Sequence, residues 1–279
     1  MQISVAVPSY NYARYIRDCL SSIQSQDYAN FEVLIADGGS TDGSLEIIRE
    51  FCDADSRFRL VSCEDEGQAD AVDKAFRLAR GDILCYLNAD DLYLTTAAFR
   101  KIVGAFNAYQ GVAIVSAEGY YVDGGGKYLR PVHLRYHPLD NIGWMKYRTA
   151  VLQPATFWRS DVYRQFPFRK EFHFVFDALF FYQGYTRFSW LSIAEVVAGY
   201  RLHKENKSVT VRPARILELA KFEQYKFGRF SLRAGYLFAV FVLVFVASKI
   251  PLVGRFLSRM IYLLVNSISF VSAYTLPGI

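Results

Sequence analysis

Residues 83–93 read ILCYLNADDLY, an apolar run that ends at Asn88 and the adjacent carboxylates Asp90 and Asp91. Asn and Asp favour turns, because their side chains hydrogen-bond to nearby backbone groups, so the pattern is compatible with a solvated turn. Adjacent carboxylates also repel each other unless a cation or a proton lies between them, so the same pattern suits a metal site. The neighbouring sequence has to decide between these two interpretations.

Short β-branched runs alternate with helical patterns from the first residue to about residue 115. We expect strands at residues 3–10, 31–39, 58–65 and 82–91, and helices at residues 13–26, 44–52 and 68–81. This alternation is typical of βαβ crossovers. It predicts an α/β fold with a mainly parallel sheet that is covered by helices on both faces.

The polar residues that follow each expected strand are the first place to look for a ligand site, because open parallel sheets bind ligands outside the carboxyl ends of their strands. These residues are Pro8, Ser9 and Tyr10; Asp37, Gly38 and Gly39; Glu64 and Asp65; and Asn88, Asp90 and Asp91. Three acidic strand ends on one edge of a sheet favour a cleft that takes a cation and hydroxyl groups. The solvated turn becomes the weaker interpretation.

The alternation breaks after residue 115. GYYVDGGGKYLRP at residues 119–131 predicts a hairpin, and QPATFWRSDVYRQF at residues 153–166 predicts a loop that enters a helix. Residues 174–182 form an aromatic helical pattern with one carboxylate, Asp177, and a late strand leads to the basic, polar stretch after residue 200. Composition alone leaves Asp177 equally compatible with an ordinary, partly exposed helix residue.

The composition bounds the class of protein. The chain has 279 residues, 52% of them hydrophobic, which is enough for a substantial core. The net charge of +5 is spread along the chain, and without a long basic block or zinc-finger spacing we expect no nucleic-acid partner. The cysteines stand singly at Cys19, Cys52, Cys63 and Cys85. We therefore expect them to be reduced, buried thiols, which suit a cytosolic face. The short apolar stretch before Pro8 does not predict a secretory signal.

Six segments, in this order and spacing, resemble the family 2 inverting glycosyltransferases, which use nucleotide-sugar donors and have a GT-A fold. The segments are VAVPSYNYARYIRDCLSSIQSQDY, FEVLIADGGSTDGSLEII, EDEGQADAVDKAF, GDILCYLNADDLY, QPATFWRSDVY and YRLHKENKS. The resemblance covers roughly residues 1 to 210. It implies a domain at residues 1–212, with a nucleotide-binding half at 1–115 and an acceptor half at 116–212.

The resemblance also implies roles for particular residues. Asp90 would bind a divalent metal, Mg or Mn, and Asp177 would be the catalytic base. The residues that would bind the nucleotide-sugar are Pro8, Tyr10 and Asp37 at the nucleoside, Asp65 and Gln68, Asn88 near the ribose, Asp91 in support, and Arg201 and His203 at the leaving diphosphate.

Two residues depart from the commonest pattern of that family. Asn88 stands where many members have an acid, which removes one charge from the metal site. Phe176 stands where many members have Glu directly before the base. An apolar neighbour would raise the pKa of the Asp177 carboxyl by desolvation and make it a better proton acceptor.

The implied reaction is transfer of a sugar from a nucleotide-sugar, UDP-linked, to a glycan or a lipid-linked glycan. Two other functions stay open. A nucleotidyltransferase would need a basic, Gly-rich phosphate loop after the first strand, and PSYNYARY is not one. A non-catalytic, membrane-tethered nucleotide-sugar binding protein would have lost its base, and the presence of Asp177 argues against it.

The tail at residues 213–279 predicts membrane-associating helices. AGYLFAVFVLVFVAS at residues 234–248 is uncharged but shorter than the roughly 20 residues that a spanning helix needs. PLVGRFLSRMIYLLVNSI at residues 251–268 has an apolar helical face with arginines elsewhere. We expect a peripheral or re-entrant attachment to the membrane surface at the cytoplasmic face of the cell membrane, with a buried core helix as the alternative.

Overall fold

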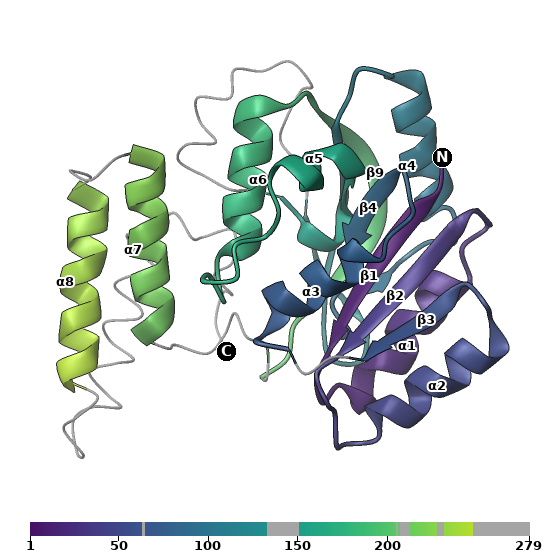
Figure 1. Ribbon diagram of the computed structural model, residues 1–279, viewed down its shortest axis with the longest axis horizontal. Coiled ribbons are helices and arrows are strands. Elements are labelled where there is room, and N and C mark those ends of the chain that lie inside the picture. The colour runs from purple at the N-terminus through teal and green to yellow at the C-terminus, as the bar shows by residue number, and fades with distance from the viewer. Residues whose placement is uncertain (63–64, 133–150, 205, 207–212, 228–231, 248–279) are drawn as a thin grey trace. The chain divides into compact units, whose positions relative to one another are not determined.

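The computed structural model describes residues 1–62, 65–132, 151–204, 206, 213–227 and 232–247 (Figure 1). Its contacts divide the chain into two compact units. The first contains Met1–Asp140, Val151–Lys170 and Gln183–His203, and the second contains Asn141–Ala150, Glu171–Tyr182 and Lys204–Ile279. The predicted domain boundary at residue 212 lies outside the described residues, so it stays a prediction.

The first unit is built on one sheet. Among the described residues this sheet has nine strands in the order β3-β2-β1-β4-β8-β6-β9-β5, with β7 paired to β6. The strands are β1 (Ile3–Ser9), β2 (Phe31–Asp37), β3 (Phe58–Ser62), β4 (Ile83–Tyr86), β5 (Leu92–Tyr93), β6 (Ile114–Val122), β7 (Tyr128–Val132), β8 (Thr156–Arg159) and β9 (Trp190–Arg201).

The sheet is mixed, which corrects the expectation of a mainly parallel sheet. Strands β3, β2, β1 and β4 run parallel, as predicted for the first half of the chain, and β6 also runs parallel to β9. Antiparallel pairs join β8 to β4 and β6, β5 to β9, and β7 to β6. The alternation of strands and helices predicts parallel pairs only where it is unbroken.

Strand β8 is a second correction, because residues 153–166 were predicted as a loop entering a helix. The loop is a single 3-10 turn at Gln153–Ala155, and the next four residues are strand. Phe157 and Trp158 point to opposite faces of the sheet, and both are fully buried because β8 lies between β4 and β6. A strand of four residues is too short for its two-residue hydrophobic period to be recognised in the sequence.

Helices cover both faces of this sheet. Ile3, Val5 and Val7 of β1 share one apolar core with side chains from α1, α2 and α4. On the other face, Phe76 of α3 packs edge-on against Trp158, which in turn contacts Tyr86. The helices are α1 (Ala13–Gln24), α2 (Ser44–Ala54), α3 (Gln68–Arg77), α4 (Ala98–Ala108), α5 (Ser160–Gln165), α6 (Phe176–Arg187), α7 (Pro213–Phe227) and α8 (Leu232–Ala247).

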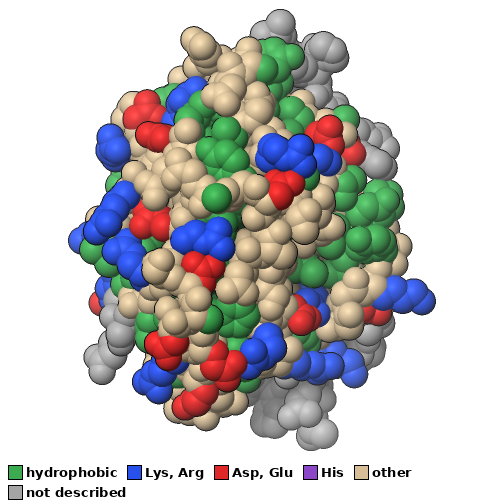
Figure 2. Space-filling model, turned by 90° about the vertical axis from the view of Figure 1, so that its right-hand side faces the viewer, with side chains coloured by type: hydrophobic (Ala, Val, Ile, Leu, Met, Phe, Trp, Pro, Cys, Tyr) green, Lys and Arg blue, Asp and Glu red, His purple; other side chains and the backbone are tan. Residues whose placement is uncertain are grey.

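Several surface charges of the first unit form ion pairs. Cationic and acidic side chains are interspersed on the face shown in Figure 2. Among the ion pairs of the first unit are Arg17–Glu50 at 2.7 Å, Arg100–Asp27 at 2.7 Å and Lys101–Glu195 at 2.6 Å. Interspersed charges are unlike the basic stripe of a nucleic-acid surface. The absence of a nucleic-acid partner stays a prediction.

In the second unit, α7 and α8 form an antiparallel pair (Figure 1). They pack through a small apolar core of Ile216, Ala220, Leu237 and Val240. Other apolar side chains of α8 are exposed: Leu232, Tyr236, Phe238, Val242, Leu243 and Phe245. Within the described part of the chain, no helix combines the length and the apolar character that crossing a membrane requires. The amphipathic pattern at residues 251–268 lies outside the described residues.

Candidate active site

The turn that follows β4 carries Asn88, Asp90 and Asp91. The backbone N–H of Asp91 donates to the carbonyl of Asn88 at 2.9 Å, so the segment is a turn, as its Asn and Asp content predicts. The turn is not solvated, however. Asp90 is 5% exposed and Asp91 1% exposed. Two buried carboxylates on one short turn need compensating partners.

Asp91 is held inside the protein by two hydrogen bonds. Its Oδ1 accepts from the backbone N–H of Arg201 at 2.9 Å, and its Oδ2 accepts from the side-chain amide of Asn88 at 3.1 Å. Burial, and then the neighbouring charge of Asp90, raise the pKa of Asp91 well above its ordinary value. The hydrogen bond to Arg201 joins the turn to β9, and the supporting role predicted for Asp91 stays a prediction.

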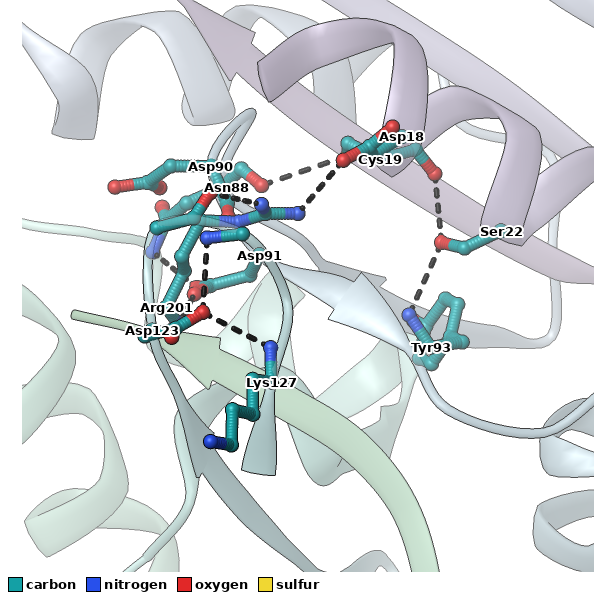
Figure 3. Close-up of polar contacts among 12 residues, drawn as sticks. Asp18, Cys19, Ser22, Asn88, Asp90, Asp91, Tyr93, Asp123, Lys127 and Arg201 are labelled. Atoms are coloured by element: carbon teal, nitrogen blue, oxygen red, sulfur yellow. Dashed lines mark hydrogen bonds and ion pairs between the residues drawn. The ribbon is translucent and has the colours of Figure 1, made fainter. Parts of the chain in front are cut away.

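Arg201 lies at the end of β9 and connects three segments of the first unit (Figure 3). Its Nε donates to the carbonyl of Asp90 at 2.8 Å, its Nη1 to the carbonyl of Gly124 at 2.9 Å, and its Nη2 to Asp18 of α1 at 3.2 Å. The side chain is 1% exposed. In this structure the guanidinium organises the turn, and the predicted contact of Arg201 with a diphosphate stays a prediction.

His203 lies against Asp90. Its Nε2 is 2.9 Å from Oδ2 of Asp90, and its ring packs at a tilt on Tyr15 of α1, with ring centroids 4.6 Å apart. Sequence reasoning assigned His203 to the diphosphate and did not join it to Asp90. No local sequence pattern joins His203 to Asp90, because their contact depends on strand pairing. Strand β5, which directly follows the turn, pairs with β9, and Gly199 lies opposite Leu92.

A carboxylate and an imidazole are both ligands that Mn²⁺ accepts. The described residues hold no group of three or more His, Cys, Asp and Glu side chains placed to bind a metal ion. Mg²⁺ in phosphate-handling enzymes is commonly held by only one or two carboxylates together with the phosphates of the substrate. Asp90 with His203 therefore fits a site that is completed by a ligand, and does not fit a cage built entirely from protein.

Asn88 uses both ends of its amide. Its Oδ1 accepts from Gln68 at 2.5 Å, and its Nδ2 also lies 3.2 Å from Oε1 of Gln153. Gln153 donates in turn to the carbonyl of Tyr86 at 2.6 Å. An acid at position 88 could accept but not donate when ionised, so the departure from the commonest family pattern has a role here. Gln153 was not singled out from the sequence, since a lone Gln in a loop carries no signal.

Asp37, at the end of β2, is buried and stabilises the loop that follows it. Its Oδ1 accepts from the backbone N–H groups of Gly39 at 3.0 Å and Ser40 at 2.8 Å. Its Oδ2 accepts from the Ser40 hydroxyl at 2.7 Å. These bonds fix the loop that follows the strand. Recognition of the nucleoside by Asp37 stays a prediction.

The ends of β1, β2 and β3 meet around Gly38. A Cβ atom placed on Gly38 would lie 2.7 Å from Oδ2 of Asp65 and 3.4 Å from a ring carbon of Tyr10. Pro8 lies opposite Ala36 in the parallel register of β1 and β2. Three of the residues predicted to bind the nucleotide-sugar, Pro8, Tyr10 and Asp65, thus lie at one edge of the sheet, as expected when parallel strands end together. Glu64 lies outside the described residues.

Asp177 is the second residue of α6 and belongs to the second compact unit. The side chain is partly exposed, and its Oδ1 accepts from the backbone N–H of Ala178 at 2.7 Å. The residue before it, Phe176, is buried. A carboxylate in the first turn of a helix is stabilised by the helix dipole.

The first unit is thus an α/β protein with acidic strand ends and a carboxylate–imidazole pair at the carboxyl edge of its sheet, which is where open α/β folds bind their ligands. Residues 4–189 match the family described as Glycosyl transferase family 2, and the chain belongs to that family. An uncharacterized glycosyltransferase of Nostoc sp., alr2836, is 31% identical over 116 residues. That match spans 41% of this chain and only 36% of the relative.

Solved structures show the same GT-A type of fold. Staphylococcus aureus TarS 1-349 in complex with UDP-GlcNAc superposes with a TM-score of 0.68 at 17% identity, covering 99% of this chain and 82% of that chain. A mannosyltransferase of Pyrobaculum calidifontis, PcManGT, in complex with GDP-Man and Mn²⁺ has a TM-score of 0.61 at 18% identity, covering 97% and 82%. At these identities the likeness establishes the fold alone.

Proposed function

We propose that this chain is an inverting glycosyltransferase that moves a sugar from a UDP-linked donor to a glycan or lipid-linked glycan acceptor. Membership of glycosyl transferase family 2 supports the class of reaction. The similarity to a structure that contains UDP-GlcNAc supports a nucleotide-sugar donor. The observation that carries the proposal is the contact between Asp90 and His203 at the carboxyl edge of the sheet, 2.9 Å apart.

Asp90 and His203 would hold a divalent cation, Mg²⁺ or Mn²⁺. When bound, the ion supplies positive charge that neutralises the diphosphate as it leaves. The residues around it have their own tasks. Arg201 fixes the Asp90 carbonyl at 2.8 Å, and Asp91 fixes the backbone of Arg201 at 2.9 Å. The candidate ligands are therefore positioned before any donor arrives, which is the arrangement that electrostatic catalysis requires.

Asp177 would act as the general base. The oxygen of the acceptor hydroxyl forms the new bond to the anomeric carbon, and its proton goes to the Asp177 carboxylate. The bond from the anomeric carbon to the diphosphate oxygen breaks, and the nucleoside diphosphate leaves with the electron pair. A single displacement of this kind inverts the anomeric configuration.

We further propose that the C-terminal part holds the enzyme at the cytoplasmic face of the cell membrane, peripherally or as a re-entrant structure. The exposed apolar side chains of α8, among them Leu232, Phe238 and Leu243, support this proposal. Exposed apolar side chains that gather on one surface mark sites of protein or membrane contact.

The proposed function is tested by a donor screen. Thermal shifts of the full chain with UDP-glucose, UDP-galactose, UDP-GlcNAc and GDP-mannose, with and without MnCl₂, identify the bound donor. Release of free nucleoside diphosphate is then measured with that donor. Metal-dependent stabilisation with nucleotide release is expected. Stabilisation without any release would instead indicate a non-catalytic binding protein, and release of pyrophosphate from a nucleoside triphosphate would indicate a nucleotidyltransferase.

A further inference from the structure

Glu218 is a buried carboxylate of α7 that binds three successive backbone amides. It is 6% exposed. Its Oε1 accepts from the N–H of His173 at 3.0 Å, and its Oε2 accepts from the N–H groups of Phe174 at 2.7 Å and Val175 at 3.3 Å. Successive amides that converge in this way form an anion-binding concavity. Here the anion comes from the protein itself.

These amides lead directly into the helix that carries the proposed base. The first turn of α6 is closed by the N–H of Leu179, which donates to the carbonyl of Val175 at 2.9 Å. Asp177 is two residues beyond Val175. Because helical backbone is stiff, fixing Val175 fixes the direction in which the Asp177 side chain leaves the first turn.

The same helix also holds the far end of this segment. Tyr182 packs edge-on against Phe222, with ring centroids 6.0 Å apart, and against Tyr225 at 6.1 Å. Both rings lie on the helix that carries Glu218. Residues 173–182 are therefore attached to α7 by a charged hydrogen-bond cluster at the start and by aromatic contacts at the end.

We infer that Glu218 is a positioning residue that orients Asp177 for proton transfer. The inference rests on the proposed function, in which Asp177 is the base. It also extends the proposed catalytic machinery past His203 into helix α7, which lies outside the residues 4–189 that match the family. Helix α7 then supports the chemistry, in addition to any role of the tail at a membrane.

The test compares Glu218→Ala and Glu218→Gln with a matched control, Glu223→Ala. Glu223 is another glutamate of α7 that is largely covered, but it pairs with Lys226 at 2.5 Å. Each variant is measured as the full chain for the Kd of UDP with MnCl₂ and for the kcat of UDP release from UDP-glucose, UDP-galactose or UDP-GlcNAc. For Glu218→Ala we expect an unchanged Kd and a kcat about a hundredfold lower, because small misplacements of a reacting group are that costly.

Two further results separate positioning from general damage. Glu218→Gln keeps an oxygen that can accept hydrogen bonds from the backbone amides, so it should recover much of the lost kcat. If the alanine variant does not fold, the glutamine variant is used for the comparison instead. In an Asp177→Asn background, Glu218→Ala should cause little further loss, because residues that act through one group are not additive.

The inference is overturned if Glu218→Ala keeps a normal kcat, if Glu223→Ala lowers the kcat equally, or if Glu218→Ala lowers the kcat just as much without Asp177. If Asp177→Asn itself keeps a normal kcat, the assignment of the base to Asp177 fails, and the role of Glu218 fails with it. If Asp177→Asn abolishes turnover while Glu218→Ala does not reduce it, only the role of Glu218 fails.

Discussion

At the scale of single residues, Asp90 is the side chain on which the candidate metal site depends. Asp90→Ala should remove the metal-dependent part of UDP binding and lower the kcat of UDP release by about a hundredfold to a thousandfold, as expected when one group that stabilises charge in the transition state is lost. Calorimetric titration with UDP, with MnCl₂ or with EDTA, measures the binding. Asp27→Ala, which removes a surface carboxylate paired with Arg100, is the control. Equal UDP affinity with and without chelator in the wild type would show that the site is misassigned.

Asp177 is the second residue that can be tested alone. Asp177→Asn keeps the shape of the side chain but removes the basic lone pair, so the fold and the UDP affinity should persist. General-base catalysis typically contributes about a hundredfold to ten-thousandfold, and the kcat should fall within that range. The kcat and the Kd are compared in one preparation. Near-normal turnover would place the base elsewhere, with Glu171 the first residue to examine.

At the scale of elements, α3 carries a buried carboxylate that links it to the loop after α5. Asp70 pairs with Lys74 at 2.9 Å and also binds Lys170. Burial alone would raise the pKa of Asp70, but Lys170, Lys74 and the N–H of Glu66 outweigh burial and hold it well below the ordinary value. A carboxyl with a lowered pKa stabilises the fold above its unfolded pKa of about 3.9, and that contribution is lost as the pH falls through the folded pKa.

Lys170→Ala should therefore lower the free energy of unfolding at pH 7 by about 1 kcal/mol, since one charged hydrogen bond to a buried group is lost while Lys74 stays. The variant should also begin to lose stability at a higher pH than the wild type on acidification, because its Asp70 pKa is less depressed. Urea unfolding between pH 7 and pH 3 measures both effects. Lys101→Ala, which breaks a surface pair with Glu195, should change little. An equal effect of the two substitutions would contradict the role assigned to Lys170.

At the scale of the whole molecule, we expect the C-terminal part to bind membranes while the first unit binds the nucleotide. The full chain should sediment with anionic liposomes at physiological salt. A chain ending at Ser208 should stay in the supernatant and still bind UDP with MnCl₂, because the candidate donor residues up to His203 all belong to the first unit. A full chain that stays in the supernatant would make the tail a core or oligomer element instead.

Local sequence patterns were sufficient to predict most elements of the first half of the chain. Strands and helices up to β4 begin within one residue of the predicted positions, because burial on one or both faces imposes a hydrophobic period along each element. Their ends were predicted less well: α3 ends at Arg77 and β4 at Tyr86, before the predicted residues 81 and 91. The glycines at residues 124–126 predicted the turn of the hairpin that β6 and β7 form. Motif order was equally informative, since it indicated the family that residues 4–189 match.

The contacts between distant side chains, in contrast, depend on tertiary structure. His203 contacts Asp90 across 113 positions of the sequence, Gln153 contacts Asn88 across 65, and Glu218 binds Phe174 across 44. Tertiary structure also placed β8 between β4 and β6, where its four residues become a buried strand. Periodicity reports the environment of each residue along its own element. Partners that are distant in the chain are chosen by sheet register and helix packing, and these depend on the whole core at once.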